Sequence, residues 1–200
     1  MINVLRTYAV FCVVLCASFF SLAEQSPSLS STTQVEGVNL PKIFQWNDRV
    51  LPLSGAGLRT QYFFNVAVIA LYGSSSYSEA TGSPLIDFPA VVEIHFLRDV
   101  DWDDITGELD LGLKANQTKE EMVNLSPAIK QLNEVIKTAG EVKDGSSVSL
   151  LMRENEVEVR LNKKLLGTNS TPGLGKALLK IWLGDHPVQE SVKKALLGKN

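Results

Sequence analysis

This chain has only two cysteines and two histidines, which limits the disulfide bonds, thiol-based sites and metal sites that it can form. The two cysteines, Cys12 and Cys16, both lie near the N-terminus, so removal of that segment leaves a chain without thiols. Disulfides and cysteine-based sites are then excluded. The two histidines, His95 and His186, are far apart and have no cysteine or glutamate at metal-binding spacing, so no metal site is predicted. The Gly-x-Ser-x-Gly turn of serine hydrolases is also missing.

An excess of basic charge is lacking as well. The 19 Lys and Arg residues stand against 22 Asp and Glu, which gives a net charge of −3. The chain has no surplus of positive charge to neutralise the phosphates of a nucleic acid, so nucleic acid is not an expected partner. The rest of the composition, with 44% hydrophobic and 20% charged residues, is typical of a folded globule. At 200 residues, one domain is expected.

The N-terminus has the features of a secretory signal peptide. Arg6 precedes an uncharged, mostly apolar run over residues 8–20, and the small residues Ser21 and Ala23 follow it. The run is shorter than the roughly 20 residues that a membrane-spanning helix needs, and no second such run follows. The sequence therefore predicts a signal peptide over residues 1–23, a mature chain without a transmembrane segment, and a periplasmic or secreted location.

The remaining chain divides into a leader and one domain. Residues 24–34 are polar and rich in serine and threonine, which predicts a flexible leader before a domain over residues 35–198. Residues 62–72 form a nearly continuous apolar run, which is typical of a central strand covered on both faces. Residues 73–84 are expected to form a loop. Apolar runs and alternation predict strands at 35–40, 43–46, 50–53, 62–72, 90–97, 148–152 and 157–161.

Helical periodicity replaces the strand pattern from Asp101 onward. Thr118 and Glu121 have the spacing of a capping box, which predicts a second helix start. Pro127 interrupts the stretch that follows and, with Ser126 as a cap, favours two helices in tandem over one long helix. Further helices are expected at 171–183 and 188–197. This order predicts an α+β fold, in which an antiparallel sheet carries helices mainly on one face.

A run of acidic residues precedes the first of these helices. Asp99, Asp101, Asp103 and Asp110 fall on ligand positions of a calcium loop, but Asp104 replaces the glycine of that loop and the bidentate glutamate is missing. We therefore interpret the acidic residues as the start of a helix, where negative charge is favourable.

Arg59 is the most informative charged residue. It follows Gly55-Ala56-Gly57, which lacks the third glycine and the βαβ context of a phosphate loop and is expected to form a turn with close backbone approach. Because Arg59 also precedes the most apolar strand, its guanidinium is expected at the rim of the core, where it needs an acceptor. Two interpretations stay open. Its partner is either a carboxylate of the chain itself or an anionic ligand at the mouth of an apolar cleft.

Four segments of the chain carry a resemblance to a known family. They are Gly55-Ala56-Gly57-Leu58-Arg59, Val66-Ala67-Val68-Ile69-Ala70-Leu71-Tyr72, His95-Phe96-Leu97-Arg98-Asp99-Val100 and Ile181-Trp182-Leu183-Gly184-Asp185-His186-Pro187. In order and approximate spacing they resemble chalcone isomerase-fold proteins, above all the secreted bacterial chalcone isomerase-like branch, over roughly residues 35–198. The resemblance implies an open-faced β-sandwich, in which a large antiparallel sheet carries a helical layer and a ligand cleft lies between them.

The same resemblance implies a site. In catalytic plant members, the arginine after Gly-x-Gly stabilises the negative charge that develops as a phenolate adds to an α,β-unsaturated ketone. Fatty-acid-binding relatives use this arginine to hold the ligand carboxylate. Arg59 matches it and Asn133 falls near the pocket asparagine, so both are implied as ligand-binding residues. The tail of the ligand is then expected against Phe63 and Ala67.

The other polar pocket positions of the family are lost. Ala67 stands at the catalytic threonine and at about the place of the carboxylate-binding tyrosine of fatty-acid-binding relatives. Ser126 falls near a later pocket tyrosine, and Ile181 at a second threonine. We therefore assign no catalytic residue and no cofactor, and predict a non-catalytic protein that binds a small amphipathic or aromatic anion, such as a fatty acid, at Arg59. The alternatives are a fold-only structural or interaction domain and an intramolecular lyase of the chalcone isomerase type.

Overall fold

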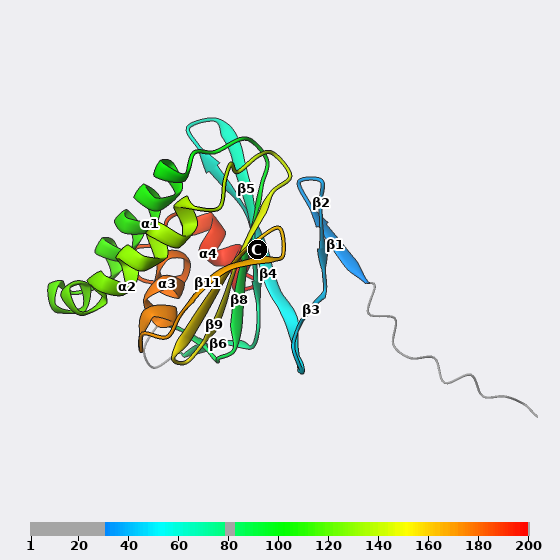
Figure 1. Ribbon diagram of the computed structural model, residues 1–200. Helices are drawn as coiled ribbons and strands as arrows, with labels where there is room; N and C mark the ends of the chain where they lie inside the picture. The colour runs from blue at the N-terminus through cyan, green and yellow to red at the C-terminus, as the bar shows by residue number, and fades with distance from the viewer. Residues whose placement is uncertain (1–30, 79–82, 200) are drawn as a thin grey trace, which may run out of the picture.

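The computed structural model describes residues 31–78 and 83–199 (Figure 1). The predicted signal peptide and residues 24–30 of the predicted leader lie outside the described residues. The elements are β1 (Thr32–Val35), β2 (Val38–Pro41), β3 (Ile43–Trp46), β4 (Arg49–Gln61), β5 (Phe64–Tyr72), β6 (Ser75–Ser78), β7 (Ser83–Ile86), β8 (Ala90–Phe96), α1 (Trp102–Asn116), α2 (Lys119–Lys137), β9 (Ser147–Arg153), β10 (Glu156–Leu161), β11 (Lys164–Asn169), α3 (Leu174–Leu183) and α4 (Glu190–Leu196).

A seven-stranded sheet in the order β11-β10-β9-β8-β5-β4-β3 forms the centre of the molecule. Every neighbouring pair of its strands is antiparallel. Figure 1 shows the helices together on one side of this sheet, with the β1–β2 hairpin apart from them. The predicted α+β fold, with helices on one face of a large antiparallel sheet, is confirmed.

The strand β5 explains why the sheet has a core on each face. Its side chains alternate between a large cluster under the helices and a smaller one on the opposite face. Ala67, Ile69 and Leu71 belong to the first, and Val68, Ala70 and Tyr72 to the second. The prediction of a central strand buried on both faces is therefore confirmed for β5.

The segment Gly55-Ala56-Gly57 is part of a strand, and its prediction as a turn is wrong. It lies inside β4, which runs without interruption for 13 residues. The glycines are needed because α4 packs directly on this strand: a Cβ on Gly55 would lie 2.1 Å from the carbonyl oxygen of Ala195. The expected close backbone approach is thus present, but between a strand and a helix.

The turn comes a few residues later than the sequence predicted. Gln61 pairs with Phe64, so Tyr62 and Phe63 form the turn between β4 and β5 instead of the start of the long strand. Phe63 is 98% exposed and cannot form a wall beside Arg59 as expected.

The helix α2 continues through Pro127, so the predicted pair of tandem helices in this stretch is wrong. A proline inside a helix removes one hydrogen bond and costs about 3 kcal/mol. Burial of Leu125 and Ile129 on either side of it favours the continuous helix. The predicted capping box is present: the Thr118 amide donates to Glu121 Oε2 at 2.7 Å, and the Glu121 amide donates to Thr118 Oγ1 at 3.2 Å.

Short edge strands were missed. β1 occupies the end of the predicted leader and pairs with β2 across a turn at Glu36-Gly37, so the expected strand over 35–40 is a hairpin. β6 and β7 form a separate hairpin that begins in the predicted loop over 73–84 and ends just after it, and β11 adds to β10 at the edge of the large sheet. These strands are four to six residues long and do not alternate apolar with polar residues, which leaves little strand pattern in the sequence. Among the helices of the described residues, none has the length and apolar character needed to span a bilayer.

Candidate functional site

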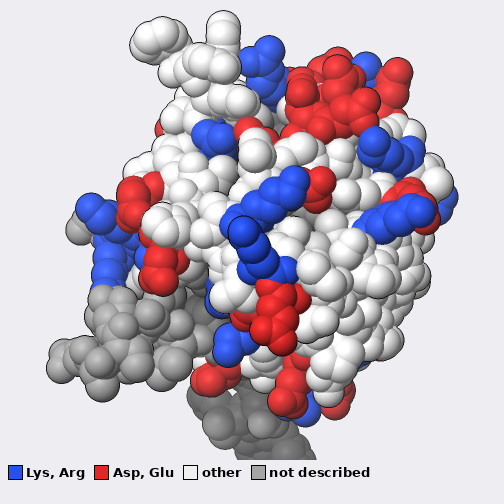
Figure 2. Space-filling model, turned by 90° about the vertical axis from the view of Figure 1, so that its left-hand side faces the viewer, with Lys and Arg blue, Asp and Glu red and all other residues white. Residues whose placement is uncertain are grey.

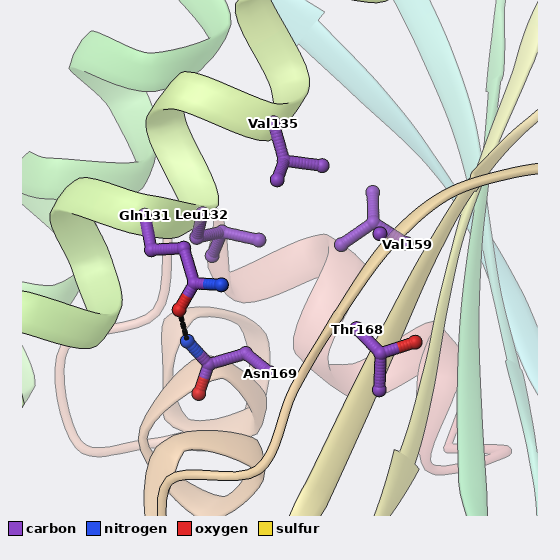
Figure 3. A pocket seen from close by; sticks show the side chains of 7 residues that line it. Gln131, Leu132, Val135, Val159, Thr168 and Asn169 are labelled. Atoms are coloured by element: carbon purple, nitrogen blue, oxygen red, sulfur yellow. Dashed lines mark hydrogen bonds between the residues drawn. The ribbon is translucent and has the colours of Figure 1, made fainter.

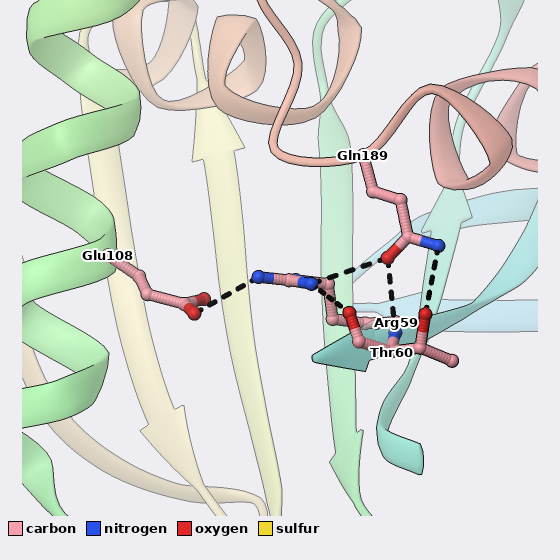
Figure 4. Close-up of polar contacts among 4 residues, drawn as sticks. All are labelled: Arg59, Thr60, Glu108 and Gln189. Carbon is pink, nitrogen blue, oxygen red and sulfur yellow. Dashed lines mark hydrogen bonds and ion pairs between the residues drawn. The ribbon is translucent and has the colours of Figure 1, made fainter. Parts of the chain in front are cut away.

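Arg59 lies between the sheet and the helical layer. Its strand has an irregular register between Arg59 and Thr60, and such bulges change the direction of a side chain. The guanidinium reaches toward α1, where Nη2 donates to Glu108 Oε1 at 3.1 Å (Figure 4). The side chain of Arg59 is 15% exposed and that of Glu108 is 41% exposed. Arg59 therefore has a carboxylate partner from its own chain, as one of the two sequence interpretations required.

Gln189 holds the other side of the guanidinium. Its Oε1 atom accepts from Arg59 Nη1 at 3.4 Å and from the Thr60 amide at 3.1 Å (Figure 4). Arg59 Nη1 also donates to the Thr60 carbonyl. Gln189 precedes α4, so these bonds tie the end of β4 to that helix. No local sequence pattern marks Gln189 or Glu108, because both meet Arg59 only in the folded chain.

A groove begins at Glu108 and opens at the end of the helical layer. Its volume is about 820 Å³, within the range of small-molecule sites. The first half of α1, the β4–β5 turn, the end of β8 and residues 140–143 enclose it. Its apolar lining includes Phe64, Val66, Phe96, Val100, Ile105 and Val142. Glu108 lines the groove and Arg59 does not, so a ligand in the groove meets the Arg59–Glu108 pair on its Glu108 side.

Carboxylates surround the outer end of this groove. Asp99, Asp101, Asp103, Asp104 and Glu141, which we call the acidic rim, all line it. Three of them have cationic partners: Lys143 lies 3.2 Å from Asp99 and 2.9 Å from Glu141, and Lys137 lies 2.6 Å from Asp103.

Hydrogen bonds at the rim shift two pKa values. The Asp144 amide and, to a smaller extent, the Lys143 ammonium hold the pKa of Asp99 below its usual value. Glu141 and Asp99 raise the pKa of Lys143 in turn. Within the described residues, no group of three or more His, Cys, Asp or Glu side chains is arranged to hold a metal ion.

The opposite end of the helical layer is closed. A cavity of only about 10 Å³ lies between α2 and the strands β10 and β11 (Figure 3). Asn169 Nδ2 donates to Gln131 Oε1 at 2.7 Å across its edge. That room suits about one water molecule. This cavity is therefore too small for an organic ligand.

The residues singled out from the family resemblance do not converge. Ala67 is buried and pairs with Arg59 in the sheet register, so these two are neighbours. Asn133 instead lies between α2 and α1, where Nδ2 donates to Asp110 Oδ1 at 3.4 Å. Asp110 follows Glu108 by two residues, which is about 200° around α1, so Asn133 is not brought to Arg59. Ser126 is exposed, and Ile181 is buried where α3 meets α1.

A buried polar group on the other face of the sheet was also missed. Glu93 is buried, lies 3.2 Å from His95 Nε2, and accepts from Ser149 Oγ at 3.3 Å. Burial, with a smaller contribution from the Glu93 charge, raises the pKa of Tyr72 nearby. The Glu-x-His spacing in a strand places Glu93 and His95 on one face, which is the signal that could have identified the pair.

Two comparisons with known proteins concern the fold and the family of this chain. The sequence matches the family described as chalcone isomerase-like over residues 32–198. The structure is similar to the crystal structure of a fatty-acid binding protein from Arabidopsis thaliana, with a TM-score of 0.63 and 11% identity over 84% of this chain and 96% of that chain. No curated protein matches. The structural likeness shows the fold, and because the family match covers most of the sequence, the chain belongs to the chalcone isomerase-like family.

Proposed function

We propose that this protein binds a small amphipathic carboxylate, such as a fatty acid, without converting it, and that Arg59 holds the head group. The observation that carries the proposal is the Glu108 carboxylate paired with Arg59, because Glu108 also lines a groove of mixed apolar and acidic lining. A guanidinium presents its donors in a fork that fits a carboxylate. The Arabidopsis protein with this fold is a fatty-acid binding protein, which supports the same ligand class here.

Binding requires an exchange of carboxylates. Glu108 occupies Arg59 Nη2, while Gln189 and the Thr60 carbonyl hold Nη1. Glu108 is the more exposed partner and can turn toward water, whereas Arg59 is fixed from two sides. The ligand carboxylate then takes the place of the Glu108 carboxylate on Arg59, and the ligand tail lies along Phe64, Val66 and Phe96. Because one carboxylate replaces another, the guanidinium is never left buried and unpaired.

The test is a comparison of Arg59→Gln with the parent protein in calorimetric titration with dodecanoate. Loss of a charge-assisted contact is expected to weaken binding roughly ten- to a hundredfold. Dodecanol, which has the same tail without the charge, should bind the two proteins equally. Arg160→Gln is the matched control, because Arg160 is also partly buried and paired with a glutamate, Glu158 at 2.7 Å, on the opposite face of the sheet. No dodecanoate binding by the parent protein would refute the proposal.

Glu108→Gln tests the exchange itself. Removing the internal competitor should raise the affinity for dodecanoate by roughly two- to fivefold, since a partly exposed ion pair of this kind contributes up to about 1 kcal/mol. Glu134→Gln, at an exposed glutamate of α2 outside the groove, should leave the affinity unchanged. A lower affinity in Glu108→Gln would show that Glu108 supports the site instead of competing for it.

The Arg59–Glu108 bond also favours a second candidate, a domain that keeps the fold for a structural role. In that case Arg59 only connects β4 to α1. Arg59→Gln would then lower the thermal midpoint, and neither it nor the parent protein would bind dodecanoate. The titration and a melting curve on the same samples therefore separate the two functions.

The proposed binding takes place outside the cytoplasm, in the periplasm or after secretion. The support is the apolar run that ends at Ala23. The mature chain is expected to begin at Glu24. Intact-mass measurement of the exported protein checks this, and a cell-associated product that retains Met1 contradicts it.

A further inference from the structure

The β4–β5 turn presents three consecutive aromatic residues to solvent. Tyr62 is 88% exposed, Phe63 98% and Phe64 60%, and we call them the aromatic turn. Single exposed apolar residues are ordinary, but adjacent large ones on a soluble protein often mark an interaction site. Tyr62 and Phe64 also line the groove, together with the apolar side chains of Val66 and Phe96.

The fold does not require aromatic residues at this turn. Tyr62 has a φ of +56°, in the left-handed region that favours glycine, asparagine or aspartate and is uncommon for a bulky side chain. Short hairpin turns are normally built from such small or polar residues. Aromatic residues therefore add backbone strain and exposed apolar surface, and an unfavourable conformation of this kind points to a role outside folding.

The charges next to the aromatic turn are mainly negative. The acidic rim lines the same end of the groove, and Asp101 and Asp104 have no ion pair within the described part of the chain. Arg98 lies over the Phe64 ring at 4.9 Å, and Lys143 is shared between Asp99 and Glu141. Figure 2 shows Asp and Glu gathered at the upper end of the helical face, the end at which Figure 1 places the start of α1.

We infer that the aromatic turn and the acidic rim form a docking surface for a basic, amphipathic segment of a partner protein. Apolar side chains of that segment would cover Tyr62 and Phe63, and its lysines or arginines would pair with Asp101 and Asp104. Carboxylates beside the rings repel anionic lipid headgroups, which disfavours an anionic membrane. A second copy of this chain, with a net charge of −3 and the same rim, is also a poor complement. The inference does not depend on the proposed ligand.

The experiment measures fluorescence anisotropy with a labelled synthetic helical peptide of leucine and lysine and a matched peptide of leucine and glutamate. The parent protein should bind the lysine peptide more tightly than the glutamate peptide, and added salt should weaken this binding. Tyr62→Asn with Phe63→Ser should weaken it roughly tenfold or more, because central aromatic contacts dominate such interfaces. The fold should survive, since asparagine tolerates the positive φ at position 62.

A second variant tests the charges separately. Asp101→Asn with Asp104→Asn should reduce both the affinity for the lysine peptide and its salt dependence, whereas Glu134→Gln, at an exposed carboxylate of α2 outside the groove, should leave them nearly unchanged. The inference is overturned if the turn variant binds the lysine peptide as tightly as the parent protein does. It is equally overturned if the parent protein, and not the turn variant, sediments with phosphatidylcholine or phosphatidylglycerol vesicles while the peptide does not bind.

Discussion

Gly55→Ala is expected to lower the free energy of unfolding by about 3 kcal/mol, which corresponds to a thermal midpoint about 6 to 12 °C lower for a protein of this size. The added Cβ would lie 2.1 Å from the Ala195 carbonyl oxygen and 2.8 Å from that of Leu196. These are backbone atoms of α4 and its end, so no side-chain rotation relieves the overlap and the helix must move away from β4. Thermal unfolding followed by circular dichroism measures the effect.

Gly107→Ala is the matched control for this prediction. Gly107 lies in α1, and a Cβ there would meet nothing within 4 Å. Alanine is favoured over glycine in a helix by about 1 kcal/mol, so this variant should be slightly more stable than the parent protein. If Gly55→Ala were as stable as Gly107→Ala, the packing of α4 on β4 would not be as tight as the structure has it.

The comparison of Gly55 with Thr118 shows which features of the fold were predictable. The capping box of Thr118 and Glu121 is local, since both hydrogen bonds join residues three apart, and the sequence predicted it correctly. The glycine at position 55 is there because of α4, at the other end of the chain. A Gly-Ala-Gly segment read locally favours a turn. Its place in a strand could not be predicted without knowing what packs on it.

Pro127 and Arg59 also show that contacts between distant parts of the chain could not be predicted from the local sequence. Pro127 does disfavour a helix locally, but burial of Leu125 and Ile129 on the sheet side outweighs its effect. The sequence places Arg59 at the rim of the core, where it needs an acceptor, and leaves two partners open, a carboxylate of the chain and an anionic ligand. The choice of partner depends on where α1 and the start of α4 lie relative to the end of β4, so Glu108 and Gln189 could not be named from the sequence.

A chalcone is expected to close to its flavanone in the presence of this protein no faster than in buffer, and without stereochemical preference. Catalysis of this reaction needs the phenolate oxygen held about 3 Å from the accepting carbon and donors placed where the enolate charge develops. Of the family's polar set, Arg59 alone lies beside Ala67 in the part of the chain that the structure describes. Its charge is offset by Glu108 at 3.1 Å.

The missing hydroxyls decide this outcome. Ala67 beside Arg59 has none, Ser126 is exposed on α2, and Ile181 is buried among apolar residues. Loss of one donor to a developing oxyanion typically costs about 10² to 10³ in rate, so two or three losses remove most of the acceleration that such a site provides. Because chalcones also cyclise unaided, chirality is the sharper measurement. A racemic product at the buffer rate supports a binding protein, whereas an enantiomeric excess that disappears in Arg59→Gln would establish residual catalysis at this guanidinium.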